Sequence, residues 1–292
     1  MSNTQYSYSI GDTVSLGCTA IDNIDGEVTC SYSGTVDSNT LGTYDITYTA
    51  EDSSGNIATL VVTYTINEAN DYLLMDLFEY YDDAEGLSGV NLEVALRGII
   101  SDYTYVSYDA ARYILDETDA DPNQSGNVIL VYTQYSVTGE WYCPTTADCN
   151  WNREHVWPQS LLDYDTTMSA DLHNLKPADS GENSSRSNKY YDWVTSSSTY
   201  EPPDDVKGDI ARILFYMMVR YEILDLVDTV PSTYEMALLS VLLEWHELDP
   251  VDDFESNRND VIYSYQNNRN PFIDYEHFAE LIWEDHPYYS SN

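Results

Sequence analysis

The sequence predicts an α+β fold in which a small all-β sandwich precedes a larger, mainly helical domain. Short alternating segments fill residues 1–67, whereas helical periodicity dominates residues 68–292. A chain of 292 residues is long enough to form two domains of this kind. No run of about 18 apolar residues is present, so no membrane span and no membrane partner are expected.

The first region reads as short strands with one buried face. Apolar and aromatic residues alternate with polar ones at six positions: Tyr44, Ile46 and Tyr48, and Leu60, Val62 and Tyr64. The stretches "DNIDGEVT", "GTYDITYTAEDSSGN" and "VVTYTI" resemble the immunoglobulin-like modules that bacterial secreted and cell-wall proteins carry. The resemblance implies a spacer or surface-binding role for residues 1–67.

The second region carries apolar residues at helical spacing. The expected helices lie in "DYLLMDLFEYYDDAEGL", "SGVNLEVALRGIISDY", "SYDAARYILDETDADP", "DIARILFYMMVRYEIL" and "STYEMALLSVLLEWHEL", and "NVILVYT" predicts a buried strand between them. Acidic and polar residues alternate at 119–127, as in a calcium-binding loop. However, Gln124 stands where that loop needs Gly and Leu130 where it needs Glu, so we interpret the stretch as a polar turn.

Charge is the most extreme property of the sequence. Acidic residues number 51 and basic residues 11, which gives a formal net charge of −40. Such a surface stays hydrated in concentrated salt, where screening suppresses its self-repulsion. The composition therefore favours salt adaptation, with simple solubility as the alternative. Taken alone, the charge argues against a nucleic-acid partner.

The four cysteines predict an exported protein. No CxxC pair or nearby His gives them the spacing of a zinc finger. Their separations favour two local disulfides, Cys18–Cys30 and Cys143–Cys149, with four buried free thiols as the alternative. The opening "MSNTQYSYSIG" lacks the basic region and apolar core of an export signal. We therefore expect an extracellular protein whose signal peptide is absent from this chain.

Two polar stretches carry residues suited to chemistry. In "NREHVWPQS", a neutral His155 can take a proton from water, and Glu154 can hold a hard cation. Successive strand residues point to opposite faces, so these two need a bend or twist to serve one site. The second stretch, "DLHNLKPADSGENSSRSNKYYDW", offers Asn183 as an oxygen ligand and Arg186 as a phosphate contact.

These stretches resemble the bacterial endonuclease I family of secreted and periplasmic nucleases, a branch of the His-Me (ββα-metal) finger enzymes. "GDIARILFYMMVRY" and "WHELDPVDDFESNRNDVIYSYQNNRNPFID" match the family in order, so the resemblance covers residues 70–280. It implies a mainly helical nuclease domain with a ββα-metal core, in which His155 is the general base that activates water. It also implies that Glu154 and Asn183 bind one Mg²⁺, with Mn²⁺ or Ca²⁺ as substitutes.

The resemblance further implies hydrolysis of double- and single-stranded DNA by a monomer, with 5′-phosphate products and little sequence preference. RNA is a further candidate substrate. Ser169 departs from the Glu that some family members carry two residues before the Asp of "DLHN". The insertion that supplies a phosphate-binding Arg in Gram-negative relatives is also missing. Substitutes for that Arg are expected among the remaining cations: Arg186 in a catalytic role, and Arg153, Lys189, Arg258 and Arg269 as substrate contacts.

Other polar residues near these motifs favour structural roles. We expect His173 to orient its loop, His246 and Trp157 to be packed, and Asn268–Asn270 to support the site. The main alternative function is a catalytically silent surface-binding or adhesion protein on the nuclease fold. A metal-dependent phosphodiesterase acting on RNA and a glycosidase are further alternatives, although no carboxylate-pair motif supports the glycosidase.

Salt should modulate the expected activity in an unusual direction. Six basic residues fall within the site motifs, which predicts that cations gather where a phosphate binds: Arg153, Lys176, Arg186, Lys189, Arg258 and Arg269. At about 1 M salt the Debye length is about 3 Å, so long-range repulsion by the acidic surface disappears while short contacts persist.

We predict that plasmid cleavage, measured across a salt series, peaks at elevated salt. A maximum at very low salt followed by a steady decline, as counterion release gives a basic nuclease, contradicts this prediction.

Overall fold

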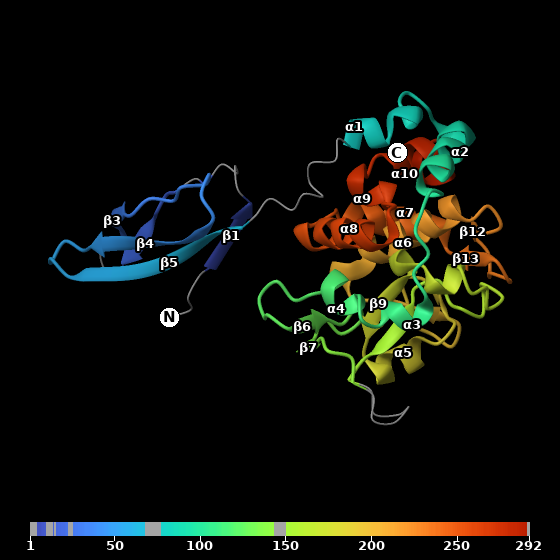
Figure 1. Cartoon of the computed structure of the whole chain (residues 1–292), viewed down its shortest axis with the longest axis horizontal. Helices are drawn as coiled ribbons and strands as arrows, with labels where there is room; N and C mark the ends of the chain where they lie inside the picture. The colour runs from blue at the N-terminus through green and yellow to red at the C-terminus, as the bar shows by residue number, and fades with distance from the viewer. Residues whose placement is uncertain are drawn as a thin grey trace. The chain divides into compact units, whose positions relative to one another are not determined.

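The computed structural model describes residues 5–9, 14, 16–22, 26–67, 77–142 and 150–290 (Figure 1). The chain divides into two compact units, Met1–Met75 and Asp76–Asn292. Among the described residues, no helix combines the length and apolar character needed to cross a bilayer.

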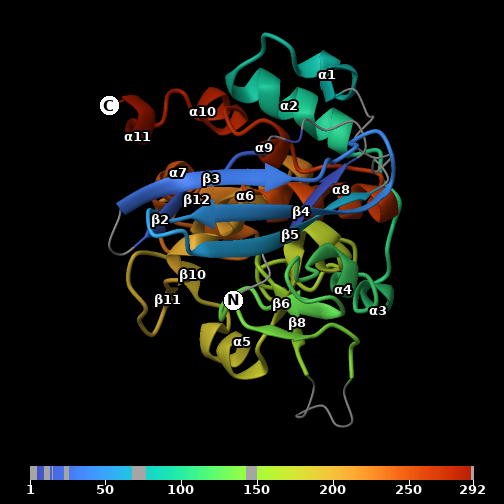
Figure 2. The same ribbon diagram turned by 90° about the vertical axis from the view of Figure 1, so that its left-hand side faces the viewer.

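The first unit is a single five-stranded sheet in the part of the chain that is described. Its strands are β1 (Gln5–Ser9), β2 (Ala20–Asp22), β3 (Gly26–Ser33), β4 (Gly42–Glu51) and β5 (Ile57–Asn67), in the order β1-β5-β4-β3-β2. β1 runs parallel to β5, and the other neighbours are antiparallel (Figures 1 and 2). A two-sheet sandwich is the expectation from sequence. Alternation, however, shows only that one face is buried and does not identify the element that covers it.

The buried face is the one that the alternation predicts. Ile46 lies opposite Val62, and Tyr44 lies opposite Tyr64, in the β4–β5 register. The core of this unit consists of Ile46, Val62 and Tyr64, against which partly buried side chains pack, including those of Val14, Leu16 and Val36. Residues outside the strands therefore supply part of the cover that a second sheet supplies in a sandwich.

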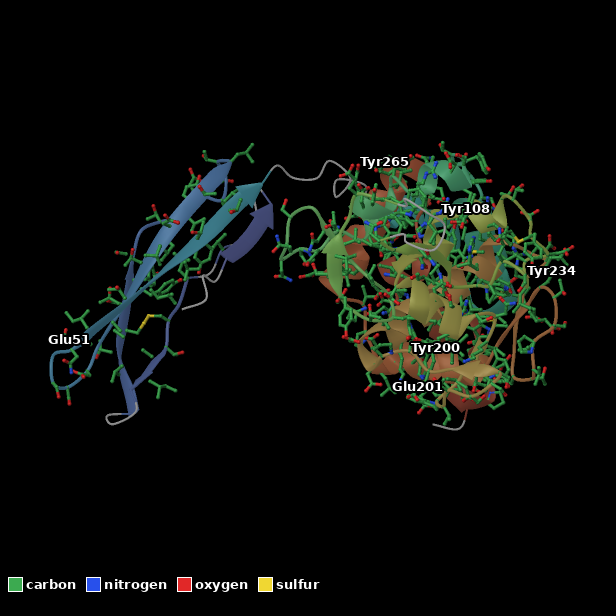
Figure 3. The ribbon with its side chains drawn as sticks, turned by 90° about the horizontal axis from the view of Figure 1, so that it is seen from below. Glu51, Tyr108, Tyr200, Glu201, Tyr234 and Tyr265 are labelled. Carbon is green, nitrogen blue, oxygen red and sulfur yellow. A yellow bond between two sulfur atoms is a disulfide. The ribbon has the colours of Figure 1, made fainter. Side chains whose placement is uncertain are left out.

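A disulfide joins Cys18, in the segment before β2, to Cys30 in β3 (Figure 3). This confirms the first predicted cysteine pair. The second predicted pair, Cys143–Cys149, lies outside the described residues.

The second unit is mainly helical, as expected. Its α-helices are α1 (Leu77–Tyr80), α2 (Gly89–Ile100), α3 (Tyr108–Ala111), α4 (Leu115–Thr118), α5 (Ser180–Arg186), α6 (Lys207–Arg220), α7 (Leu239–Leu248), α8 (Asp253–Gln266), α9 (Pro271–Asp274), α10 (Phe278–Ile282) and α11 (Pro287–Ser290). Its 3₁₀ turns are η2 (Asp82–Ala84), η3 (Met168–Ala170), η4 (Leu172–Asn174) and η5 (Asp204–Val206).

Eight short strands of the second unit form two-stranded sheets. The pairs are β6 (Asn127–Ile129) with β7 (Ser136–Thr138), β8 (Asn152–His155) with β9 (Leu175–Ala178), β10 (Tyr190–Tyr191) with β11 (Thr199–Tyr200), and β12 (Asp225–Val227) with β13 (Glu235–Ala237). The β8–β9 pair contains the "NREH" and "LKPA" segments, so it carries the residues with expected chemistry.

Helix α6 forms the centre of this unit (Figures 1 and 2). Every residue from Lys207 to Val219 is buried, which is the property of a helix that other elements cover on all sides. Helices α2, α7 and α9 and the turn η4 pack against it. Trp157 and His246 are buried in the same region, so both are packed residues as expected.

The segment after α8 is held by buried polar contacts. Arg269 lies 2.7 Å from a carboxylate oxygen of Asp260 and 2.7 Å from one of Asp274. The Asn268 amide donates to the Ile100 carbonyl at 2.9 Å and to the Tyr216 hydroxyl at 2.8 Å. These bonds connect the segment to α2 and α6, and α6 packs against the "DLHN" turn.

Replacing Arg269 by Met should strongly destabilise the fold. The variant keeps much of the side-chain volume but leaves Asp260 and Asp274 without their counter-ion, and breaking a buried pair costs about 3–5 kcal/mol. The matched control is Arg97→Met, because Arg97 pairs with Glu93 at a partly exposed position, where about 1 kcal/mol is expected. Urea unfolding of the two variants measures the difference. Equal losses contradict the prediction.

Candidate active site

A strand–strand–helix unit carries the expected site. β8 pairs antiparallel with β9, with Glu154 opposite Lys176 and His155 opposite Leu175. Helix α5 begins just after β9, where the Asp179 carboxylate accepts from the backbone N–H groups of Gly181 and Glu182 at 2.8 and 2.9 Å. The acidic cap fixes where the helix starts. Consequently Asn183 and Arg186 lie on a short helix that follows the β8–β9 pair directly.

His155, the last residue of β8, has a neutral imidazole ring. Its Nε2 lies 2.9 Å from the carbonyl oxygen of Ser169. A carbonyl can only accept, so this bond requires the proton on Nε2 and leaves a lone pair on Nδ1. Burial lowers the pKa of His155 to about 4, which keeps the ring neutral at pH 7. The residue at 169 acts here through its backbone, so the departure from Glu does not remove this bond.

Aromatic contact also holds the His155 ring. The Tyr108 ring stacks on it with centroids 5.2 Å apart and an interplanar angle of 28°. The Arg153 guanidinium lies over the Tyr108 ring at 3.6 Å and donates to the Tyr108 carbonyl. Arg153 and His155 are two residues apart on β8 and so share one face of the strand. Tyr108 therefore packs against both.

Glu154 is a buried carboxylate with a compensated charge. It is 2% exposed, and its Oε1 accepts from the Tyr132 hydroxyl at 2.7 Å and lies 3.0 Å from Arg186 Nη1. The Tyr132 hydroxyl also shares a 2.8 Å hydrogen bond with that of Tyr191. Burial raises the pKa of Glu154, and the charge of Arg186 and the bond from Tyr132 offset part of that effect. The carboxylate is thus fixed by two side chains, Arg186 and Tyr132, and Tyr191 in turn holds Tyr132.

Arg186 connects the two halves of the site. Its guanidinium is buried and donates to the carbonyls of His155 at 2.9 Å and Val156 at 2.5 Å, in addition to pairing with Glu154. The predicted contact with a phosphate is not supported, because this side chain is only 1% exposed. Asn183 lies three residues earlier on α5, on the same helix face and half-buried. The face of α5 that carries Asn183 is therefore the one that meets the end of β8.

The types of donor atom on Glu154 and Asn183 suit a hard cation. Glu154 and Asn183 offer carboxylate and carboxamide oxygens, which Mg²⁺ and Ca²⁺ prefer as ligands. The described residues contain no group of three or more His, Cys, Asp or Glu side chains that could hold a metal ion. A closed site of the structural zinc type needs four such ligands. Mg²⁺ instead keeps several waters and uses only one or two protein oxygens, so a two-ligand set is sufficient for it.

Comparison with known proteins identifies the family of the chain. The endonuclease I family model matches residues 88–200 and 192–277. The chain belongs to the endonuclease I family. A bacterial surface protein immunoglobulin-like domain model matches residues 9–69.

An extracellular ribonuclease of Bacillus subtilis (strain 168) is 44% identical over 230 residues, covering 71% of this chain and 79% of that protein. One from Bacillus amyloliquefaciens matches equally, and an extracellular deoxyribonuclease of Aeromonas hydrophila is 32% identical over 37% of this chain and 50% of that protein.

In this endonuclease I family member, the "DLHN" motif is structural. The Asp171 carboxylate accepts from the hydroxyls of Tyr216 and Tyr221 at 3.0 and 2.8 Å. His173 is fully buried, with its ring centroid 4.2 Å from that of Tyr216. The Asn174 side chain accepts from the backbone N–H of Trp157 at 2.7 Å. The motif therefore fixes the turn that follows Ser169, and the expected orienting role of His173 agrees with these contacts.

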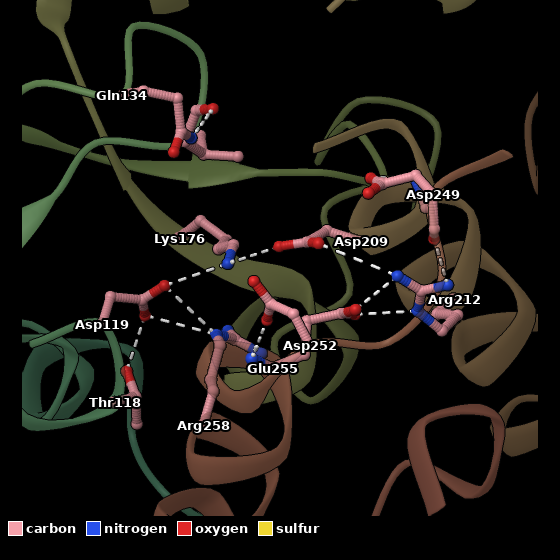
Figure 4. A network of polar contacts seen from close by, with 12 residues as sticks. Thr118, Asp119, Gln134, Lys176, Asp209, Arg212, Asp249, Asp252, Glu255 and Arg258 are labelled. Atoms are coloured by element: carbon pink, nitrogen blue, oxygen red, sulfur yellow. Dashed lines mark hydrogen bonds and ion pairs between the residues drawn. The ribbon is translucent and has the colours of Figure 1, made fainter. Parts of the chain in front are cut away.

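The cations of the site motifs do not form a phosphate-facing patch, which corrects the expectation. Arg258 is buried and lies 3.2 Å from Asp119, and Lys176 lies 3.1 Å from the same carboxylate and 3.4 Å from Asp209 (Figure 4). Arg269 is enclosed in the same manner, as described above. A buried cation is stable only when paired, and these cations use their charge inside the fold. Neither Arg258 nor Arg269 is retained as a substrate contact.

Three of the eleven basic residues, all within the described part of the chain, have no ion pair with a carboxylate: Arg153, Lys189 and Arg220. Lys189 follows α5, and its backbone N–H donates to the Arg186 carbonyl at 3.2 Å. Arg153 and Lys189 thus lie on the two elements of the site and remain candidates for contact with a phosphate.

Sequence reasoning misses the tyrosines of the site. Tyr108 contacts His155, and Tyr132 contacts Glu154, although both tyrosines lie far from these residues along the chain. Tyr191 lies only five residues after Arg186, whose guanidinium is over its ring. The abundance of tyrosine, 28 residues, was the one available signal. It carries no spacing that identifies which tyrosines reach the site.

The buried histidines should make stability depend on pH. Burial lowers the pKa of His173 to about 4, whereas the unfolded chain has a pKa near 6.5. Between these values the unfolded state binds a proton that the folded state does not. The free energy of unfolding therefore keeps this contribution above pH 6.5 and loses it as pH falls toward 4. We predict that His173→Gln makes the slope between pH 6 and 5 shallower, by at most about 1.4 kcal/mol per pH unit. Urea unfolding at several pH values measures the slopes, and identical slopes contradict the prediction.

Proposed function

We propose that this chain is an extracellular, divalent-cation-dependent endonuclease that hydrolyses phosphodiester bonds with little sequence preference. One observation carries the proposal: His155 is held neutral with Nε2 bonded to the Ser169 carbonyl, beside a carboxylate fixed on a strand–strand–helix unit. Membership of the endonuclease I family and the extracellular nucleases among the relatives support it.

His155 acts as the general base in this proposal. Its Nδ1 takes a proton from a water molecule as the water oxygen attacks phosphorus, and the bond between phosphorus and the 3′-oxygen breaks. The products are a 5′-phosphate end and a 3′-hydroxyl, the latter protonated from solvent. A ring with a pKa of about 4 is unprotonated at neutral pH, which is the state that a base requires.

Glu154 and Asn183 would hold the cation. In this proposal, β8, β9 and α5 are the two strands and the helix of a ββα-metal core. Bound Mg²⁺, Mn²⁺ or Ca²⁺ supplies neutralisation of charge on the phosphate and the leaving 3′-oxygen. Arg186 and Tyr132 act as positioning residues, since both contact Glu154 Oε1. Arg153 and Lys189 are the proposed substrate contacts.

The proposal also covers the organisation of the chain. We assign residues 1–67 to an immunoglobulin-like module with a spacer or surface-binding role and 68–292 to a nuclease domain that acts as a monomer. The family matches at 9–69 and 88–277 support this division. DNA, double- or single-stranded, and RNA are the proposed substrates. Activation by salt remains part of the proposal because of the net charge of −40.

Cleavage assays test the mechanism. Plasmid and oligonucleotide substrates are incubated with the full chain in Mg²⁺ or EDTA, and product ends are mapped. We expect EDTA to abolish cleavage, and His155→Ala to reduce it by about 10²- to 10⁴-fold, the typical contribution of a general base. The matched control is His277→Ala, since His277 is exposed and, among the described residues, its ring packs against Tyr275 and Phe278 of its own segment.

A second readout separates the roles of base and ligand. Glu154→Gln and Asn183→Ala should weaken Mn²⁺ binding measured by calorimetry, whereas His155→Ala should leave it intact. Undiminished cleavage by His155→Ala would show that the base is misplaced. A wild-type chain that cleaves nothing at any salt concentration would instead favour the catalytically silent binding protein.

A further inference from the structure

The segment that leads into α3 is rich in tyrosine. Between Ser101 and Tyr113 it contains Tyr103, Tyr105, Tyr108 and Tyr113. Figure 1 shows this part of the chain running from α2 to α3 along the outside of the second unit. The rings of Tyr105 and Tyr113 are 54% and 60% exposed, which is unusual for side chains of this size. Aromatic rings are thus presented to solvent along one segment.

Guanidinium groups lie among these rings. Arg153, one of the cations without an ion pair, lies 3.6 Å from the Tyr108 ring centroid and 5.9 Å from that of Trp141. Arg112 lies 4.7 Å from the Trp141 ring and 4.9 Å from the Tyr113 ring. Tyr108, Arg153, Trp141, Arg112 and Tyr113 therefore follow one another in continuous contact.

The series of contacts begins at the proposed base. Tyr108, which Figure 3 labels, is its first member. Its ring stacks on that of His155 with the centroids 5.2 Å apart. Tyr108 has His155 and Arg153 as ring neighbours, so its ring is engaged in holding the site. The exposed rings further along, above all Tyr113, are available to a ligand. The same series of contacts connects these rings to His155.

We infer that these residues, together with Tyr105, form an aromatic–arginine surface that binds the unpaired nucleotides of single-stranded substrates. The inference rests on the proposed function and deepens it. Bases stack on the exposed rings, and the phosphates between them contact Arg153, whereas the Arg112 guanidinium is paired with Asp109 and contributes its contacts with the rings. Each base of a single strand has a free face, whereas bases in a duplex stack on each other. The enzyme should accordingly prefer single strands.

The charge of the chain supports stacking as the source of affinity. A net charge of −40 repels a polyphosphate, and most of the cations are paired inside the fold. Stacking of a base on an aromatic ring needs no net attraction between charges and tolerates every sequence. It also does not read the 2′-hydroxyl, which is the group that distinguishes RNA from DNA. Single-stranded DNA and RNA should therefore bind alike.

Binding measurements test the inference without cleavage. The full chain carrying His155→Ala is titrated into fluorescein-labelled 12-mers of oligo-dT, oligo-U and a mixed-sequence duplex, in Mg²⁺ and at several salt concentrations. Fluorescence anisotropy gives each Kd. We expect both single strands to bind more tightly than the duplex. Adding Tyr113→Ala should weaken single-strand binding by about 5- to 100-fold, the usual effect of removing one stacked base, while Tyr113→Trp should preserve it.

The matched control is Tyr135→Ala. Tyr135 is 68% exposed, like Tyr113, but has no ring or guanidinium partner among the described residues. Single-strand affinity unaffected by Tyr113→Ala, equal losses with Tyr135→Ala, or a duplex bound as tightly as single strands each overturn the inference. Cleavage by the chain with His155 intact is measured in parallel. Its absence would overturn the proposed function, whereas cleavage together with unchanged binding in Tyr113→Ala would overturn this inference alone.

Discussion

The site depends on one buried ion pair, Arg186 with Glu154. The two charges lie 3.0 Å apart and are almost completely enclosed. Enclosing either charge alone costs several kcal/mol, so the guanidinium and the carboxylate are stable there only together. The same guanidinium donates to the carbonyls of His155 and Val156. A single side chain of α5 thus fixes the Glu154 carboxylate, the backbone at His155, and the helix on which Asn183 lies.

Most basic side chains of the second unit are likewise paired with carboxylates. Eight of the eleven basic residues, counted by excluding Arg153, Lys189 and Arg220, pair with carboxylates. The network around Lys176 and Arg258 is an example in which cations link β9, α4, α6 and α8 through shared carboxylates (Figure 4). The acidic excess is left for the surface. Few cations then remain for a polyanionic substrate, which is the constraint that any account of nucleic-acid binding must meet.

Tyrosine partly compensates for the shortage of unpaired cations, because it combines an apolar ring with a polar hydroxyl. In the interior, the hydroxyls of Tyr132, Tyr216 and Tyr221 donate to the carboxylates of Glu154 and Asp171, so they stabilise charges without adding any. Near the site, the ring of Tyr108 packs against both His155 and Arg153. One residue type thus serves both the polar interior and the exposed aromatic surface.

The sequence by itself determined the helical second unit, the alternating strands with Ile46 and Val62 on the buried face, and the Cys18–Cys30 disulfide. These depend on periodicity and short spacings, which a linear pattern records. Only the tertiary structure decided which cations are enclosed and which tyrosines reach the site. Arg186 and Arg258 look like surface cations in sequence, but carboxylates and carbonyls from distant segments surround them. Burial is a property of the whole packed chain, so no local pattern could assign it.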